Sequence, residues 1–439
     1  MSLSVKRLAE LGKEASRKLA TVPSEKRSAA IREAGDAIGQ AASRLLEANA
    51  ADLTVASELL EGGEITAATF ERLRLTDNKI DEVARSMRAV ADLPDPVGRV
   101  LHRTELDSGL VLEKITCPLG VLAVIFEARP DAVTQISSLA LKSGNAVILK
   151  PGREVEKTAL ALVEVICQSL TRSGLPEEAI GVVLGRQAVR ELLDMPDLID
   201  MVIPRGSKQL VEFIQNNTRI PVLGHAEGIC HIYVDAAADT QMALDIIDDA
   251  KTDYPAACNA AETVLVHAQI AKAFLPVLAG RMHAKQVTLR GCEKTRAVLG
   301  DLAVEAVAEA GWHHEYSELV LAVRVVGSLD EAIEHIHRYG SSHTETIVTE
   351  DRNAAEEFLA RVDAAGVFHN ASTRFADGYR YGFGAEVGIS TSKLHARGPV
   401  GVEGLTTYKY VLRGSGQVVR DYHGANAKPF THRQPPDQK

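Results

Sequence analysis

The sequence contains few cysteines, and their arrangement excludes two common uses of this residue. Five occur in 439 residues, and no two form a C-x-x-C pair. Disulfide frameworks use an even number of cysteines at regular spacing, and structural zinc sites use C-x-x-C pairs. We therefore expect a cytoplasmic chain with reduced thiols, without a disulfide framework or a metal site. The cysteines are Cys117, Cys167, Cys230, Cys258 and Cys292.

Long apolar runs and an excess of positive charge are also absent. No stretch of 18 apolar residues that could span a membrane occurs. The 49 basic and 59 acidic residues give a net charge of −10, which disfavours nucleic acid or an anionic membrane as the main partner. Apolar residues at helical spacing in the first 20 residues predict an amphipathic helix there, not a signal peptide.

The order of apolar segments predicts two α/β lobes. Residues 1–95 have helical patterns, and two β-like runs flank the turn residues 107–109. From Leu119 on, apolar strands of four to eight residues alternate with helices, and the alternation resumes after Gly228. Such alternation is typical of parallel sheets covered by helices on both faces.

Two strand ends have the residues that a nucleotide site would need. Lys150 ends one expected strand, and Arg205-Gly206-Ser207 follows another. A cation at the carboxyl end of a strand can hold a ribose or phosphate, and a glycine before a helix lets the backbone approach a phosphate. The G-x-G-x-x-G pattern is absent. Taken alone, Lys150 is also typical of a solvated lysine at a strand end, and Arg205-Gly206-Ser207 of an ordinary strand-to-helix turn.

Cys258 lies in the segment YPAACNAAETVLVH, where small residues surround it. Alanines leave room for a flat acyl group beside a nucleophilic thiolate, and Asn259 offers a side-chain donor for an oxyanion. A single cysteine is also commonly a small buried apolar residue, so the segment by itself leaves both interpretations open.

The order of the motifs PLGVLAVI, SGNAVILKPG, RGS and ACNAAE resembles that of the aldehyde dehydrogenase superfamily. Longer blocks at residues 75–98, 124–150, 222–235 and 370–410 resemble its γ-glutamyl phosphate reductase family over nearly the whole chain. The resemblance implies an α/β, aldehyde dehydrogenase-like fold with two parallel-sheet lobes and a β-rich oligomerisation arm. The domains expected are a cofactor-binding domain (1–100 and 117–228), a catalytic domain (229–388), the arm (101–116 and 408–425) and a flexible tail (426–439).

The resemblance also implies roles for individual residues. Cys258 matches the nucleophile, and Lys150 matches the lysine on the adenosine ribose of the cofactor. Gly206 and Ser207 match the pyrophosphate loop. Glu315 aligns with the glutamate that holds the nicotinamide ribose.

Two departures from the superfamily pattern bear on the reaction. Oxidising members use a carboxylate base to hydrolyse the thioester, and His225 stands at that position here. A reductase that receives an acyl phosphate must keep water from the thioester, which fits this change. The usual oxyanion asparagine is missing from the segment FEARP (126–130), so the backbone N–H of Cys258 and the side chain of Asn259 are the candidate donors.

The activity implied is reduction of L-glutamyl 5-phosphate by NADPH to L-glutamate 5-semialdehyde, with release of phosphate, in the second step of proline biosynthesis. Arg153 is a candidate partner for the 2′-phosphate of NADPH. Arg129 and Arg374 are candidates for the phosphate and the α-carboxylate of the substrate, because both groups are anionic. A solvated or structural arginine is the alternative for each.

We further expect a homo-oligomer and a glutamate 5-kinase partner that supplies the labile acyl phosphate. Two other functions remain open from the sequence. One is an NAD-dependent oxidiser that releases a free acid, and the missing base carboxylate disfavours it. The other is a non-catalytic scaffold on the same fold, which the intact segment around Cys258 disfavours.

Overall fold

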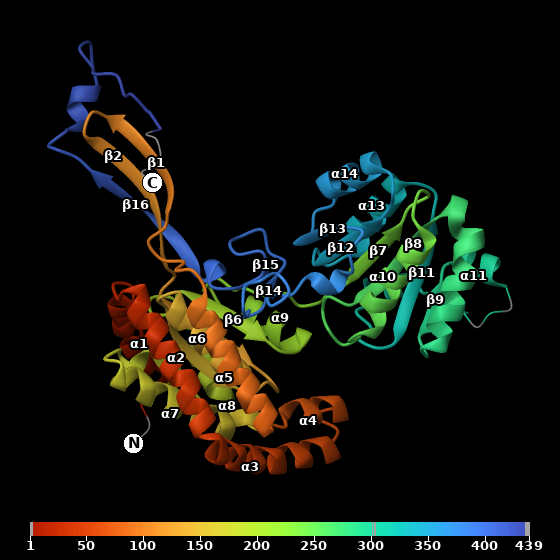
Figure 1. Ribbon diagram of the computed structural model, residues 1–439, viewed down its shortest axis with the longest axis horizontal. Coiled ribbons are helices and arrows are strands. Elements are labelled where there is room, and N and C mark those ends of the chain that lie inside the picture. The colour runs from red at the N-terminus through yellow and green to blue at the C-terminus, as the bar shows by residue number, and fades with distance from the viewer. Residues whose placement is uncertain (1–2, 301, 303, 435–439) are drawn as a thin grey trace. The chain divides into compact units, whose positions relative to one another are not determined.

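The computed structural model describes residues 3–300, 302 and 304–434, and these form two compact units (Figure 1). The first unit contains the chain up to Val222, residues 383–387 and the chain from Val400 onward. The second contains residues 223–382 and 388–399. The predicted boundary at residue 228 lies close to this division, but the return of residues 383–387 to the first unit was not predicted. The functions assigned to the domains remain predictions.

The first unit opens with helices whose starts are visible in the sequence. The hydroxyl of Ser4 accepts the backbone N–H of Arg7, and that of Thr76 accepts the N–H of Lys79, so each caps a helix as serine and threonine commonly do. The helices are α1 (Val5–Leu19), α2 (Ser24–Gln40), α3 (Ala42–Glu61), α4 (Ala67–Leu73) and α5 (Asp77–Asp92).

A four-stranded parallel sheet lies at the centre of the first unit, in the order β5-β4-β3-β6. All six residues of β3 are buried. Val121, Ala123 and Ile125 pack with residues of α1, α8 and α9, so the intervening residues face the opposite side, which must also be covered. The strands are β3 (Val121–Phe126), β4 (Ala146–Pro151), β5 (Ile180–Val182) and β6 (Met201–Arg205), and the helices are α6 (Ala132–Lys142), η1 (Arg153–Val155), α7 (Glu156–Arg172), η2 (Glu177–Ala179), α8 (Gly185–Leu193) and α9 (Lys208–Asn216).

A separate antiparallel sheet contains β1 (Val100–Asp107), β2 (Leu110–Pro118) and β16 (Thr406–Arg413), with β2 in the middle. The turn at residues 108–109 joins β1 to β2, as the sequence predicts. After η5 (Glu403–Leu405), β16 and η6 (Val419–Tyr422), the chain returns to β1, where Arg433 exchanges backbone hydrogen bonds with Glu105. The expected flexible tail is therefore attached to the arm up to Arg433, and residues 435–439 lie outside the described residues.

The second unit contains a seven-stranded parallel sheet in the order β10-β9-β11-β8-β7-β12-β13. Its strands are β7 (Cys230–Val234), β8 (Ala261–His267), β9 (Thr288–Gly291), β10 (Val304–Ala306), β11 (Val320–Val326), β12 (Thr344–Val348) and β13 (Gly366–His369). Its helices are α10 (Thr240–Thr252), α11 (Ala268–Ala284), α12 (Glu293–Leu299), η3 (Glu309–His313), α13 (Leu329–Tyr339), α14 (Arg352–Arg361) and η4 (Thr373–Phe375), and the short strands β14 (Ile389–Ser390) and β15 (Gly398–Pro399) pair with each other.

Alternate residues of the central strands face different layers of helices. Ile232 and Val264 belong to the core cluster that includes α10, α11 and α12. Tyr233 and Leu265 belong to the cluster that includes α13 and α14. The sequence predicts β7, β8, β11 and β12, and the structure confirms them together with the α/β fold class. The short strands β9, β10 and β13 were not predicted.

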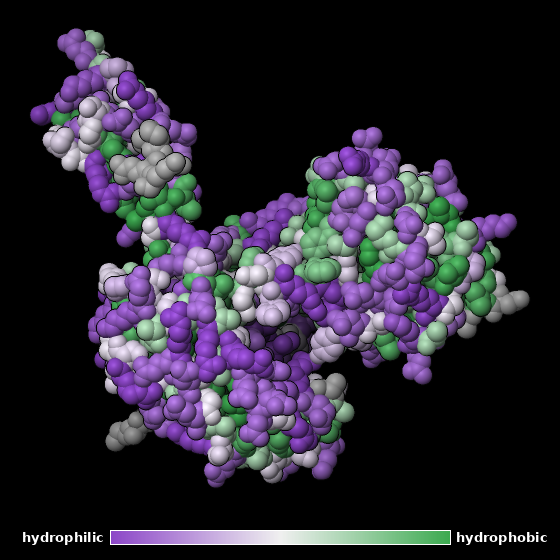
Figure 2. All heavy atoms as spheres, viewed as in Figure 1, coloured by the Kyte–Doolittle hydropathy of each residue, from purple (hydrophilic) through white to green (hydrophobic). Residues whose placement is uncertain are grey.

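Hydrophilic residues dominate the face of the molecule that Figure 2 shows, with hydrophobic residues scattered among them. Among the described residues, no helix is long and apolar enough to cross a membrane.

Candidate active site

Cys258 lies in the loop between α10 and β8 of the second unit. Two backbone hydrogen bonds tighten this loop, from Ala257 to the carbonyl of Tyr254 at 3.1 Å and from Ala260 to that of Ala257 at 2.9 Å. A Cβ atom at Gly228 would lie 2.0 Å from the carbonyl oxygen of Cys258. The loop therefore requires glycine at position 228, because any side chain there would displace the backbone of Cys258.

Burial keeps the thiols of three other cysteines protonated. Burial raises the pKa of Cys230 and of Cys117, and it raises that of Cys167 to about 12. Such thiols stay protonated at neutral pH, and the thiolate is the nucleophilic form. Cys258 is half-buried, so its sulfur can meet a substrate. The thiol of Cys230, at the start of β7, donates to the carbonyl of Cys258 at 3.4 Å and so connects the loop to the sheet.

Asn259 and Arg374, predicted to act on the substrate, are engaged with each other. Nδ2 of Asn259 donates to the carbonyl of Ala376 at 2.8 Å and to that of Arg374 at 3.4 Å. Nη1 of Arg374 donates to Oδ1 of Asn259, while Nε and Nη2 donate to Oδ2 of Asp253 at 3.2 and 3.1 Å. Both predicted roles require polar atoms that this network already uses. The network holds the loop of Cys258 against η4, and no signal in the sequence identified Asp253 as part of it. The roles of Asn259 and Arg374 towards the substrate remain predictions.

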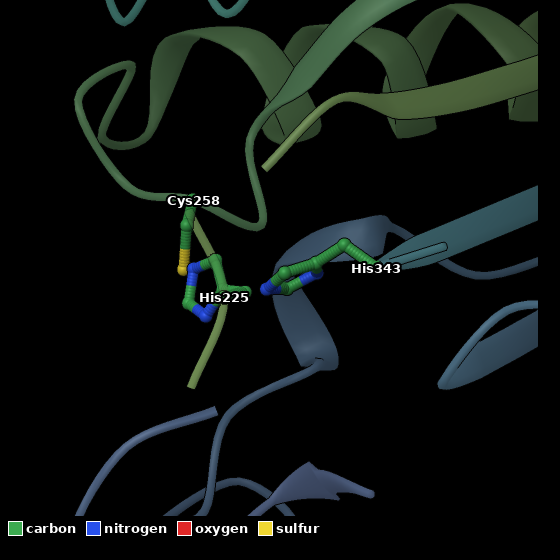
Figure 3. Close-up of side chains that lie close together, drawn as sticks. All are labelled: His225, Cys258 and His343. Atoms are coloured by element: carbon green, nitrogen blue, oxygen red, sulfur yellow. The ribbon is translucent and has the colours of Figure 1, made fainter. Parts of the chain in front are cut away.

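Two histidines lie beside Cys258. Figure 3 shows His225 between the thiol and His343, and the ligand atoms of all three residues lie within 4.8 Å of one another. The two imidazole rings meet edge to face at 5.0 Å between centroids. The sequence places His225 at the position of the carboxylate base of oxidising relatives, and the structure puts an imidazole next to the thiol there.

Glu315 also lies near this loop. Burial raises its pKa, and a hydrogen bond from the backbone N–H of Gly228 opposes the shift, as does the neighbouring His225. Gly228 lies against the backbone of Cys258, so Glu315 is connected to the nucleophile loop through Gly228. The sequence expects a ribose-binding carboxylate at Glu315. The prediction that it holds the nicotinamide ribose is not tested by this arrangement.

The other predicted cofactor residues gather at the carboxyl edge of the sheet in the first unit. Lys150 is the next-to-last residue of β4, is 9% exposed, and has a pKa lowered by burial, with three glutamates opposing the shift. Gly206 and Ser207 join β6 to α9, and the N–H of Ser207 donates to Oε2 of Glu127 at 2.9 Å. The start of α9 thus already holds an anionic oxygen, so these residues fit a phosphate group. Glu127 lies in the FEARP segment, which departs from the superfamily pattern.

Two further arginines of the first unit were predicted to bind anions. Arg153 is 50% exposed and pairs with Glu64 at 2.6 Å between Nη2 and Oε2. Arg129 is half-buried and follows Ala128, which has a φ of 49°. A positive φ is uncommon for alanine, and strained backbone of this kind is often found at functional sites.

Comparison with known proteins agrees with the geometry. The model of the aldehyde dehydrogenase family matches residues 3–303. A relative from Cyanothece sp. named gamma-glutamyl phosphate reductase is 53% identical over 97% of each chain, and one from Natronomonas pharaonis is 50% identical over 94% of each.

Solved structures show the same relationship. The crystal structure of gamma-glutamyl phosphate reductase from Thermotoga maritima superimposes with a TM-score of 0.90 at 39% identity, covering 94% of this chain and 99% of that one. An acetylating aldehyde dehydrogenase from Geobacillus thermoglucosidasius shares the fold at 19% identity, with a TM-score of 0.65 and coverage of 94% and 97%. The chain therefore belongs to the aldehyde dehydrogenase family, within the group of relatives named gamma-glutamyl phosphate reductase.

Proposed function

We propose that the chain reduces L-glutamyl 5-phosphate to L-glutamate 5-semialdehyde with NADPH, the second step of proline biosynthesis from glutamate. The observation that carries the proposal is the half-buried thiol of Cys258 beside the imidazole of His225. By the family resemblance, His225 stands where oxidising members would have a carboxylate base. The relatives named for this activity, similar over nearly the whole chain, support the choice of substrate.

In this reaction the Cys258 thiolate attacks the acyl carbon of the substrate. A C–S bond forms, the bond from the acyl carbon to the phosphate oxygen breaks, and inorganic phosphate leaves with the electron pair. The backbone N–H of Cys258 is the proposed donor to the oxyanion, because the amide of Asn259 is engaged by Arg374 and Ala376.

Members of this family use a nicotinamide cofactor, and when bound it supplies the hydride that reduces the thioester. Lys150, Gly206 and Ser207 would hold its adenosine ribose and phosphates, and Glu315 its second ribose. Cys258 then releases the aldehyde as the C–S bond breaks and the sulfur recovers the electron pair. The NADPH preference would depend on Arg153 at the 2′-phosphate.

Arg129 is the proposed partner for an anionic group of the substrate. Arg374 would not contact the substrate; it would position the loop that contains Cys258 through its bonds to Asp253 and Asn259. We also propose that the enzyme is a cytoplasmic homo-oligomer that associates through the β1-β2-β16 arm, and that a glutamate 5-kinase supplies its acyl phosphate.

The reverse reaction tests the proposal, because the acyl phosphate is too labile to supply. Purified protein would be mixed with glutamate semialdehyde and NADP, and NADPH would be followed with and without inorganic phosphate. We expect NADPH formation that depends strictly on phosphate, is lost in Cys258→Ser and persists in Cys117→Ser. Turnover without phosphate would mean that water resolves the thioester, and the oxidiser would be correct.

The scaffold alternative predicts no turnover under either condition. Alkylation of Cys258 separates it from an enzyme that has merely lost activity during purification. An enzyme would show protection of Cys258 from iodoacetamide by NADP and semialdehyde together, and a scaffold would show none.

A further inference from the structure

His225, Cys258 and His343 come from three separate segments of the second unit and converge at one point (Figure 3). His225 lies in the segment before β7, Cys258 in the loop before β8, and His343 directly before β12. In sequence, Cys258 follows His225 by 33 positions and His343 follows Cys258 by 85, so no C-x-x-C or H-x-x-H motif indicates the cluster. The sequence-based prediction of no metal site rested on such spacing.

The ring nitrogens of both histidines are oriented by hydrogen bonds to Nδ1. Nδ1 of His225 lies 2.8 Å from the carbonyl oxygen of Ile389. A carbonyl only accepts, so Nδ1 carries the hydrogen and Nε2 carries a lone pair. Nδ1 of His343 lies 2.8 Å from the hydroxyl oxygen of Thr344 and 3.6 Å from Sγ of Cys230; both can accept its hydrogen, which leaves the lone pair on Nε2. This arrangement is typical of metal-ligating histidines, whose second nitrogen donates to a carbonyl or similar group.

His343 supplies a second, independent indication of a ligand. Its side chain is fully buried, and its Nε2 atom has no hydrogen-bond partner. A buried polar atom without a partner costs about 1–3 kcal/mol, so native proteins rarely keep one without a reason. Figure 3 shows the imidazole of His343 directed at His225 and Cys258, so a bound ion there would satisfy this nitrogen.

We propose that Cys258, His225 and His343 bind a borderline-soft divalent metal ion, Zn²⁺ in the first place, and that the bound ion holds the nucleophile in an inactive form. One thiolate and two imidazoles match the ligand preference of Zn²⁺, and three protein ligands leave a fourth position for water. Binding replaces the thiol proton with the metal, so one proton is released, and the metal bond lowers the nucleophilicity of the sulfur and blocks its approach to the acyl carbon.

The present separations allow this site with small movements. Zn–S and Zn–N bonds of about 2.3 and 2.0–2.1 Å place tetrahedral ligand atoms roughly 3.3–3.6 Å apart. The atoms now lie within 4.8 Å, so they must close by about 1 Å. Cys258 and His225 are half-buried on loops and can rotate towards the buried His343.

Cobalt provides the direct test, because Co²⁺ takes zinc sites and a cobalt–thiolate bond absorbs in the near ultraviolet. The full-length protein would be titrated with Co²⁺ under reducing conditions, followed by displacement with Zn²⁺. We expect one Co²⁺ per chain with a charge-transfer band that Cys258→Ser abolishes. His225→Asn should weaken binding at least about 10-fold, and His343→Asn should do the same if it folds. Cys117→Ser and His423→Asn, which lie on the arm and the C-terminal segment, should leave binding unchanged.

A chemical readout complements the spectrum. One equivalent of Zn²⁺ should slow alkylation of Cys258 at least 10-fold, the effect should disappear with chelator, and apparent affinity should rise with pH because a proton is released. No band in the wild-type protein, or an equal band in His225→Asn, would overturn the proposal. Metal binding is measured without substrate, so a failure of the proposed reductase activity would leave this result standing, and the reverse also holds.

Discussion

The side chains of Asn259 and Arg374 hydrogen-bond to each other, although the sequence assigns them to different tasks. Arg374 is 8% exposed, and its guanidinium joins Asp253 to Asn259 on either side of the nucleophile loop. At the scale of single residues, the structure thus favours an arginine that positions Cys258 over one that meets the substrate.

Replacement of Arg374 by Ala should therefore slow alkylation of Cys258 and lower kcat, since the loop loses its clamp. Asp253→Ala should act similarly, and the double variant should be little worse than either single one, because both remove the same network. Rates of iodoacetamide modification and steady-state kinetics would measure this. Arg361→Ala, which removes an exposed ion-pair network, serves as the control. If Arg374→Ala changed KM alone, Arg374 would bind the substrate, as the sequence predicts.

Arg153 can be tested against a matched surface arginine. It is half-exposed and paired with Glu64, as Arg172 is with Glu33 at 2.6 Å. If Arg153 holds the 2′-phosphate, Arg153→Ala should lower the ratio of kcat/KM for NADPH over NADH about 10-fold, whereas Arg172→Ala should not change it. An unaltered ratio in Arg153→Ala would remove this residue from the cofactor site.

At the scale of elements, a buried ion pair joins α10 to β8 beside the nucleophile loop. Nζ of Lys251 lies 2.9 Å from Oε2 of Glu262, and both side chains are almost completely buried. Burial raises the pKa of Glu262 to about 7, and Lys251 opposes this shift. When folding raises the pKa of a carboxyl, the free energy of unfolding decreases as pH rises from the unfolded-state pKa through the folded-state pKa.

Lys251→Met should therefore destabilise the protein by about 3–5 kcal/mol at pH 8, because it leaves an unpaired buried carboxylate. The loss should be smaller at pH 5, where Glu262 can be protonated. The double variant Lys251→Met/Glu262→Gln, which keeps an acceptor for the N–H of Ser317, should recover most of the loss and show little pH dependence. Thermal unfolding at the two pH values measures this, and equal losses at both would contradict it.

At the scale of the whole molecule, the arm exposes apolar side chains on one face of an edge strand. Tyr408, Tyr410 and Leu412 alternate along β16 and are 48%, 62% and 56% exposed. Edge strands with exposed apolar residues favour pairing with another chain. The arm is therefore the surface on which we expect a second copy.

A charge on that face should weaken the association. Tyr410→Lys combined with Leu412→Lys should shift the species seen by light scattering towards the monomer at low micromolar concentration. Lys409→Gln, which changes the opposite face of the same strand, should leave it unchanged. Identical masses for all three proteins would exclude β16 from the interface.

Much of this architecture follows from local pattern. Short apolar segments such as VLAVIF and AVIL alternate with helical patterns, which is typical of strands buried on both faces, so the parallel sheets follow from the sequence. Short strands such as β9 and β10 were missed, because three or four residues have too little periodicity to distinguish them from loops. The small neighbours of Cys258 are visible locally but left its role open, and the motif ACNAAE, through the family resemblance, pointed to it as the nucleophile.

What surrounds Cys258 was decided only by the tertiary structure. Asp253, Arg374, His225 and His343 lie in different segments, and their side chains meet because parallel strands bring distant loops to one edge of the sheet. The order of residue types in the sequence by itself determined the fold class, and the family resemblance it carries pointed to Cys258 as the nucleophile. The partner of each polar group depends on distances across the fold, which no local pattern encodes, and so the structure alone showed Arg374 bonded to Asp253 and Asn259 and His343 beside the thiol.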